Sequence, residues 1–179
     1  MGFLSQFFGT NNAAQKDAKR VYRAVMEQAR KPIFYGKQCF PDNYDGRIDV
    51  LTLHIGIIFE ALRLHGEQGN RLAQAIFDEM KDDFEVALRE EGISDTGVAK
   101  RIKPMIQLFY TRVKTYTESF ESGEFDKVAG SIYGEGEAKF SNEFTQHLDD
   151  YVKDMRGNLR SMSLGELAQV KFSFPNFQD

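Results

Sequence analysis

The stretch PIFYGKQCFPDNYDGRIDVLTLHIGIIFEALRLHG, residues 32–66, decides the fold class of this chain. Its first half holds a polar, aspartate-rich turn, PDNYDGRID, and its second half is an apolar helical segment. A surface helix carries an apolar stripe over roughly a third of its circumference. In this segment one face holds Ile48, Leu51, Ile55, Ile58, Phe59 and Leu62, and a second face holds Val50, Leu53, Ile57 and Leu64. We therefore expect a helix at the centre of the domain, with neighbours on more than one side.

The composition indicates one ordinary globular domain in a reducing compartment. The chain has 179 residues, of which 41% are hydrophobic and 28% are charged, and this suffices for a single core. The formal net charge is -4 and the pI is about 5.5, so the overall charge gives no electrostatic argument for binding DNA. Cys39 is the only cysteine, so it forms no internal disulfide and gives no sign of a secreted protein.

Helical periodicity extends through most of the chain. Besides the central helix, we expect helices at about 13–30, 68–90, 96–121 and 142–161, with a short one at 125–133. Asp45 is expected to cap the central helix, and Pro104 is expected to kink or restart the helix in which it lies. Near the C-terminus, the alternation of Val170, Phe172 and Phe174 indicates a short strand or an extended tail.

These signals predict an all-α, single-domain helical bundle around a central buried helix, with a short C-terminal appendage. We divide the chain into a flexible apolar segment at 1–12, the all-α domain at 13–161 and a tail at 162–179. No apolar run reaches the ~18 residues of a transmembrane helix, and no targeting peptide is recognised. The first segment holds four large apolar residues that either pack on the domain or contact a membrane or a partner: Phe3, Leu4, Phe7 and Phe8.

The motifs that would support catalysis or metal binding are missing from the sequence. The three histidines, His54, His65 and His147, are each preceded three positions earlier by leucine or phenylalanine, which excludes the Glu-x-x-His pairs of a di-iron bundle. No His-Glu-x-x-His motif, Walker loop or Gly-x-Ser-x-Gly elbow occurs. If Gly46 were the invariant glycine of an EF-hand, Pro41 would stand at the first ligand position. We therefore expect a non-catalytic protein with no cofactor.

Two alternatives stay open at this point. A metal or haem site could combine His54 with the aspartates of a neighbouring helix, Asp78, Asp82 and Asp83. A satisfied core histidine is the simpler interpretation, because His54 has apolar neighbours. The basic run KRIK at 100–103 could bind RNA or the ribosome, although a solvated or ion-paired helix face is simpler for so few cations.

Several segments taken together carry a family resemblance. They are PIFY at 32–35, PDNYDGRIDVLTLH at 41–54, LAQAIFDEMKDDFEVALREEGISD at 72–95, GVAKRIKPM at 97–105 and FYTRVKTY at 109–116. In this order and spacing they resemble the ubiquinol-cytochrome c chaperone family in its bacterial form. The resemblance covers about Val21–Phe120 and is specific, because it mixes charged, aromatic and apolar positions. Pro104 and the REEG at 89–92 depart locally from the family pattern.

The resemblance implies a non-catalytic assembly factor for ubiquinol-cytochrome c reductase, which binds newly made cytochrome b or an early assembly intermediate. Mitochondrial relatives also work beside the translation machinery with a small partner protein, so a small partner or the ribosome is a further candidate. The resemblance, with no targeting segment recognised, places the chain in the bacterial cytoplasm. A peripheral contact with the cytoplasmic face of the inner membrane is compatible with this placement.

The family motifs also supply candidate partner-binding residues. A charged rim of this kind sets the orientation and the rate of association more than its affinity. The candidates are Phe34, Tyr35, Asp42, Asp45, Arg47, Asp49, Arg89, Asp95, Lys100, Arg101 and Lys103.

Overall fold

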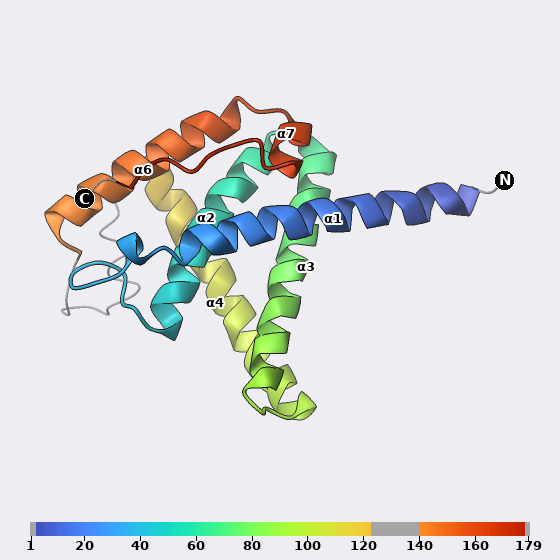
Figure 1. Cartoon of the computed structure of the whole chain (residues 1–179), viewed down its shortest axis with the longest axis horizontal. Coiled ribbons are helices and arrows are strands. Elements are labelled where there is room, and N and C mark those ends of the chain that lie inside the picture. The colour runs from blue at the N-terminus through green and yellow to red at the C-terminus, as the bar shows by residue number, and fades with distance from the viewer. Residues whose placement is uncertain (1–2, 123–139, 178–179) are drawn as a thin grey trace.

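The computed structural model describes residues 3–122 and 140–177, with side chains described from residue 13 onward except at 121. All regular elements in these residues are helical, which confirms the predicted all-α fold (Figure 1). They are α1 (Phe3–Ala29), the 3-10 turn η1 (Pro32–Phe34), α2 (Tyr44–Arg63), α3 (Gly66–Glu90), α4 (Asp95–Ser122), α6 (Asn142–Arg160) and α7 (Leu164–Ala168). None of these helices is both long enough and apolar enough to cross a membrane.

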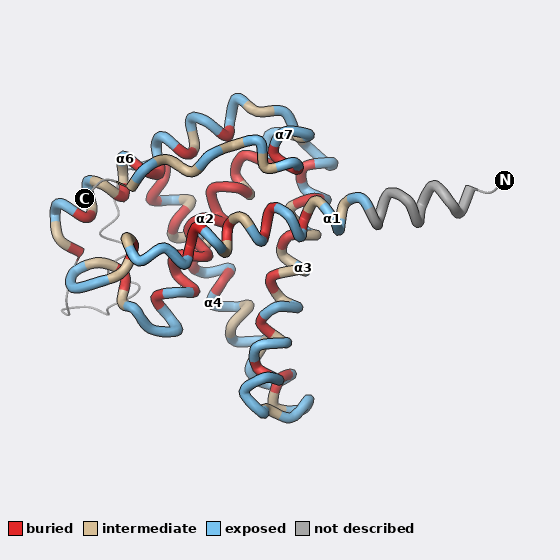
Figure 2. The backbone as a smooth tube through the Cα atoms, viewed as in Figure 1, coloured by how far each residue is buried: buried red, intermediate tan, exposed pale blue. Residues whose placement is uncertain are grey.

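Helix α2 lies at the centre of the bundle, as its sequence predicts. Fifteen of its 20 residues are buried, and Figure 2 shows this helix as the densest run of buried residues. It contacts α1, α3, α4 and α6. Figure 1 shows α1 crossing α3 and extending beyond it toward the N-terminus. The start of α3 lies close against the end of α2. This approach requires glycine at position 69, because a Cβ there would lie 1.8 Å from the carbonyl oxygen of Leu62.

One buried carboxylate joins α2 to both α4 and α6. Arg156 of α6 binds Glu60 through two hydrogen bonds, of 2.7 and 2.8 Å, and also donates to the carbonyl oxygen of Phe120 in α4. Arg160, one turn further along α6, donates to the same carboxylate. Burial raises the pKa of Glu60, but the hydrogen bonds from the two arginines outweigh it and hold this pKa below its ordinary value. Glu60 is therefore ionised, and it is joined to α6 directly and to α4 through Arg156.

The structure corrects two predictions at helix ends. The cap of α2 is Asn43, whose side chain accepts a hydrogen bond from the backbone N–H of Gly46, and not Asp45, which already lies in the first turn. Helix α1 begins at Phe3, earlier than expected, and so crosses the predicted boundary at residue 12. The side chains of residues 3–12 lie outside the described part, so the contact expected for Phe3, Leu4, Phe7 and Phe8 stays a prediction, as does the division into three segments.

In the second half of the chain, the structure contains a helix that was not predicted and decides between predicted alternatives at two places. Of the two outcomes expected at Pro104, a kink or a restart, the restart does not occur, because α4 continues from Asp95 to Ser122. Helix α7 was not predicted, although Ser163 and Glu166 form a capping box that a sequence can reveal. Residues 171–177 form an extended segment and no strand, the second of the two predicted alternatives. The short helix expected at 125–133 lies outside the described residues.

Replacing Glu60 by glutamine tests its bridging role. The Glu60→Gln variant keeps the volume but leaves two arginines facing a neutral side chain, so we expect a loss of about 3 kcal/mol in the free energy of unfolding. Urea denaturation followed by circular dichroism measures this loss. The matched control is Glu118→Gln, because Glu118 and Lys114 form an exposed pair at 3.9 Å, for which we expect a change of less than about 0.5 kcal/mol. Equal effects of the two substitutions would contradict the bridging role.

Candidate functional site

The site begins at the polar turn that precedes α2. The carbonyl oxygen of Pro41 lies so close to Gly46 that a Cβ at this position would meet it at 1.9 Å. The turn therefore folds tightly over the first residues of the helix, and Asn43 closes it as the cap. Tyr44, the first residue of α2, is left 52% exposed by this arrangement. A large aromatic side chain is thus held at the surface by a rigid turn.

Two adjoining hollows meet at Tyr44 and together form what we call the Tyr44 groove. The first, of about 220 Å³, lies between α1, α2 and α3. The second, of about 550 Å³, lies between α2, α3 and α4. Apart from Tyr44, the lining of the first includes Met26, Arg30, Tyr35, Arg47, Asp83 and Phe84. The lining of the second includes Leu88, Glu91, Lys100, Arg101, Pro104 and Met105.

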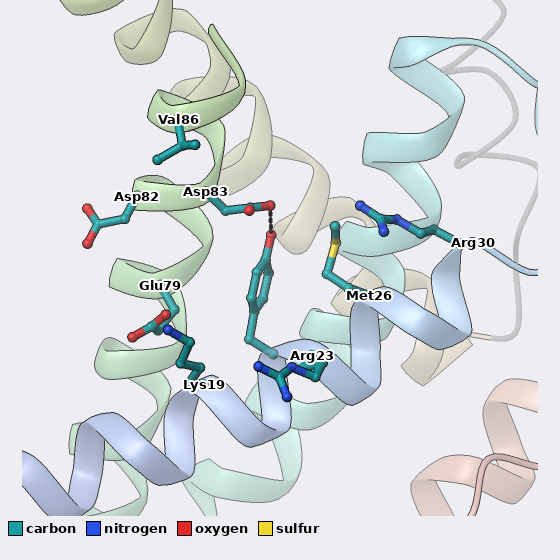
Figure 3. Close-up of a pocket in the computed structure, with 9 residues that line it drawn as sticks. Lys19, Arg23, Met26, Arg30, Glu79, Asp82, Asp83 and Val86 are labelled. Carbon is teal, nitrogen blue, oxygen red and sulfur yellow. Dashed lines mark hydrogen bonds between the residues drawn. The ribbon is translucent and has the colours of Figure 1, made fainter. Parts of the chain in front are cut away.

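A third hollow extends the groove between α1 and α3. Its volume is about 380 Å³, and it shares Met26, Arg30 and Asp83 with the first hollow. Figure 3 shows side chains of the two helices facing one another across it. The hydroxyl of Tyr22 donates a 2.8 Å hydrogen bond to Asp83, which fixes the floor of this hollow. Val86 is 50% exposed at its rim.

The structure brings Tyr35 and Arg47 together in the first hollow, and Asp42 binds Arg47 from outside its lining. The guanidinium of Arg47 forms an ion pair of 2.8 Å with Asp42 and lies 5.5 Å from the centre of the Tyr35 ring. Burial raises the pKa of Tyr35 to about 12, with Arg47 acting in the opposite direction. The hydroxyl of Tyr35 donates to the carbonyl oxygen of Ala29 at the end of α1. Arg47 is thus oriented by an aromatic ring and a carboxylate while about half of its side chain stays exposed.

The second hollow is lined by cations that form no ion pair with another described residue. Lys100 and Arg101 line it, and Lys103 lies on the same turns of α4 outside the lining. All three are exposed, and none forms an ion pair with another described residue. Burial, together with Glu91 and Asp45, raises the pKa of Tyr44, while Arg101 lowers it. These cations are therefore available to a partner that carries negative charge.

Two other predicted residues pair with each other instead. Arg89 and Asp95 join the end of α3 to the start of α4 with an ion pair of 3.3 Å. Both are exposed, and neither lines the Tyr44 groove. Asp45 is exposed in the first turn of α2. The surface patch predicted from the family motifs is thus divided between the groove and the α3–α4 connection.

Phe34 and Asp49 were predicted to belong to the surface patch, but the structure corrects this because both are buried. Phe34 has no exposed surface and Asp49 is 2% exposed. Asp49 forms a 3.2 Å ion pair with Arg112 and accepts a 3.1 Å hydrogen bond from the hydroxyl of Tyr116. Burial raises the pKa of Asp49 to about 6 against the opposing effects of Arg112 and Tyr116. Asp49 therefore positions α2 against α4 and cannot face a partner in this structure.

Tyr44 and Arg30 are groove residues that the sequence interpretation missed. Tyr44 carried a signal that could have found it, because it is the only aromatic side chain in the polar turn PDNYDGRID. Arg30 carried none, since its place in the groove depends on how the end of α1 packs on α2 and α3.

His54 is a satisfied core histidine. It has no exposed surface, and its Nδ1 lies 2.7 Å from the carbonyl oxygen of Val50, so this nitrogen carries the proton. Its Nε2 then accepts the 2.8 Å hydrogen bond from the hydroxyl of Tyr151, which in turn accepts one from Gln28. Both ring nitrogens are therefore occupied by protein groups, which argues against the metal or haem alternative.

The predicted metal partners of His54 lie elsewhere. Asp78, Asp82 and Asp83 are exposed on α3, and Asp78 and Asp83 bind Gln74 and Tyr22. No group of three or more His, Cys, Asp and Glu side chains in the described part of the chain is arranged to hold a metal ion.

The described residues form an all-α helical bundle with a cation-lined surface groove. The family model described as ubiquinol-cytochrome C chaperone matches residues 39–129, which contain α2, α3, α4 and most of the groove. The chain belongs to this family. Because the family is one of chaperones and not of enzymes, the predicted non-catalytic character is confirmed.

Two known proteins support this membership. The crystal structure of the Cbp3 homolog from Brucella abortus is similar to this chain with a TM-score of 0.77 and 30% sequence identity, over 98% of both chains. A Xenopus laevis protein named ubiquinol-cytochrome-c reductase complex assembly factor 1 is 23% identical over 107 residues. That match covers 60% of this chain and 54% of the Xenopus protein, so the chain spans about half the length of this curated relative.

His54 makes the stability of the fold depend on pH. Burial lowers the pKa of His54 from 6.5 to about 4, so the unfolded chain binds a proton here at pH values where the folded protein does not. The contribution of His54 to stability is therefore complete above pH 6.5 and falls as the pH decreases toward 4. Between pH 7 and pH 5 we expect the loss to be about 2 kcal/mol.

Urea denaturation of the wild type and of His54→Asn at both pH values measures this loss. Asp49 acts in the opposite direction, since its raised pKa makes the folded state bind a proton more readily than the unfolded chain. The relevant quantity is therefore the difference in pH dependence between the two proteins. We expect the variant to be less stable at pH 7 but to lose less on acidification. Parallel pH profiles would show that His54 is not held neutral.

Proposed function

We propose that this protein is a non-catalytic chaperone for the assembly of ubiquinol-cytochrome c reductase, and that its Tyr44 groove binds newly made cytochrome b or an early assembly intermediate. The observation that carries the proposal is the position of the groove: Tyr44, Arg47, Lys100 and Arg101 all fall within the residues matched by the chaperone family. The name of the Xenopus relative supports the assembly role.

The composition of the groove suits a protein partner. Tyrosine and arginine are enriched among the residues that contribute most to protein interfaces. In the groove the exposed Tyr44 lies between Arg47, which lines the first hollow, and Arg101, which lines the second. The cations at the rim attract a client segment of negative charge and orient it, while Tyr44, Leu88 and Met105 supply apolar contact. We expect this binding at the cytoplasmic face of the inner membrane, where a membrane client would be received.

Charge reversal in the groove tests the proposal in cells. In a strain that lacks the gene, we expect the reduced-minus-oxidised haem spectrum of membranes to lose the b-type and c-type signals of the reductase. The wild-type gene should restore them, whereas Arg47→Glu and Arg101→Glu should restore less than half, because each places a negative charge where the client carries one. Lys16→Glu is the matched control, since Lys16 is exposed on α1 outside the groove.

The possible results separate three conclusions. An unchanged spectrum in the deletion strain would contradict the assembly role itself. Full restoration by both groove variants would leave the role standing but place the client site elsewhere. Steeply salt-dependent RNA binding by the purified protein, lost when Lys100, Arg101 and Lys103 are neutralised, would favour the RNA or ribosome alternative instead.

A photoreactive amino acid at position 44 tests the client directly. If cytochrome b lies in the groove, a benzoylphenylalanine that replaces Tyr44 should crosslink to epitope-tagged cytochrome b during its synthesis. The same residue at Gln146, exposed on α6, should not. Equal crosslinking from the two positions, or none from position 44 in cells with normal reductase levels, would contradict the assignment of the groove.

A further inference from the structure

The last described segment of the chain is attached in an unusual way. Helix α7 ends in a Schellman motif, in which Lys171 N–H bonds the carbonyl of Glu166 and Val170 N–H bonds that of Leu167. Val170 has a φ of 55°, a left-handed conformation that a β-branched residue rarely adopts. From this strained residue the chain runs as an extended segment across the molecule beside α6 (Figure 1). We call residues 171–177 the strap.

Beyond Lys171, the strap is held by phenylalanine side chains. Between described residues, no hydrogen bond involves residues 172–177. Phe174 instead packs edge-on against His54, with 5.8 Å between the ring centres. Phe177 packs on Phe34, Phe144 and Tyr151, with ring centres 5.0, 5.4 and 5.6 Å away.

The surface beneath the strap is an aromatic cradle. It consists of Phe34, His54, Phe144 and Tyr151, all buried, whereas the phenylalanines of the strap are only partly buried. The polar atoms of His54 and Tyr151 are already used in the chain that runs from Gln28 to Val50. The contacts between the cradle and the strap are therefore contacts between rings, which carry little sequence specificity.

We propose that this cradle is a binding site for an extended, phenylalanine-rich segment of the client protein, and that the strap is the resident segment which the client displaces. The strap shows what the site accepts: an extended chain with rings at positions 174 and 177 and a backbone left to solvent. A membrane protein exposes segments of this chemistry before it enters the bilayer. The strap would cover the cradle when no client is present.

The cradle and the Tyr44 groove are connected along the chain by two consecutive residues. Phe34 belongs to the cradle, whereas Tyr35 lines the groove beside Arg47. A client could therefore place a charged segment in the groove and an apolar segment in the cradle. This inference rests on the proposed chaperone function for the identity of the client, but the binding property itself can be tested without a client.

The test uses the peptide KFSFPNFQD, residues 171–179, labelled with fluorescein. In the wild type the attached strap has an effective concentration in the millimolar range and excludes the peptide. In the full-length variant Phe174→Ser/Phe177→Ser the cradle is open, so we expect fluorescence anisotropy to show at least tenfold tighter peptide binding than in the wild type. The control protein is Ser173→Ala/Asn176→Ala, whose two positions are exposed, and the control peptide replaces all phenylalanines by serine.

Each result decides the matter. Tight binding of the strap peptide, but not of the serine peptide, by the phenylalanine variant alone would support the proposal. If this variant keeps its helical circular dichroism and thermal midpoint but does not bind the peptide, the cradle is not a binding site. If the variant loses its helical signal, the strap is an integral part of the core and the proposal is wrong. Neither failure changes the haem spectrum of the deletion strain, so the proposed assembly role is judged separately.

Discussion

The arrangement of this molecule depends on burying α2 together with its polar side chains. Apolar burial on every face drives the bundle together, but a carboxylate or a histidine in that position is costly unless a partner reaches it. Each of the three buried titratable side chains of α2 meets a partner from a surrounding helix: Asp49 meets Arg112 and Tyr116 of α4, His54 meets Tyr151 of α6, and Glu60 meets Arg156 and Arg160 of α6. We infer that apolar packing supplies most of the stability. The polar contacts select one rotation of α4 and α6 about their axes and one position of each along α2.

The Tyr44 groove and the cradle both lie where a turn or an extended segment, and not a helix, packs against α2. At its N-terminus the turn capped by Asn43 covers the helix only partly, and Tyr44 stays at the surface between two hollows. At its middle, the side of His54 is covered by the strap, whose residues 172–177 contribute rings but form no hydrogen bond with another described residue. A chaperone needs contacts that can be exchanged, and both places offer side-chain contacts without a ladder of hydrogen bonds to break.

Much of the fold could be predicted from periodicity, and the failures have identifiable causes. The helices around 48–62, 68–90 and 142–160 were predictable because their apolar residues repeat at helical spacing. Helix α7 was missed because five residues are too few to show a helical repeat of apolar positions. Its capping box could nevertheless have been recognised in the sequence. The buried positions of Phe34 and Asp49 were missed because a motif shows which residues matter and not whether they position a helix or meet a partner.

The sequence by itself determined the all-α class, the central place of α2 and the absence of the motifs that catalysis would need, because these follow from side-chain chemistry and spacing within single segments. It also carried the family resemblance that the comparisons confirmed. Only the tertiary structure decided that Arg30, Arg47 and Arg101 line one groove and that Phe174 and Phe177 lie over His54 and Phe34. These positions depend on contacts between residues far apart in the chain, and no local pattern specifies the angle at which two helices cross.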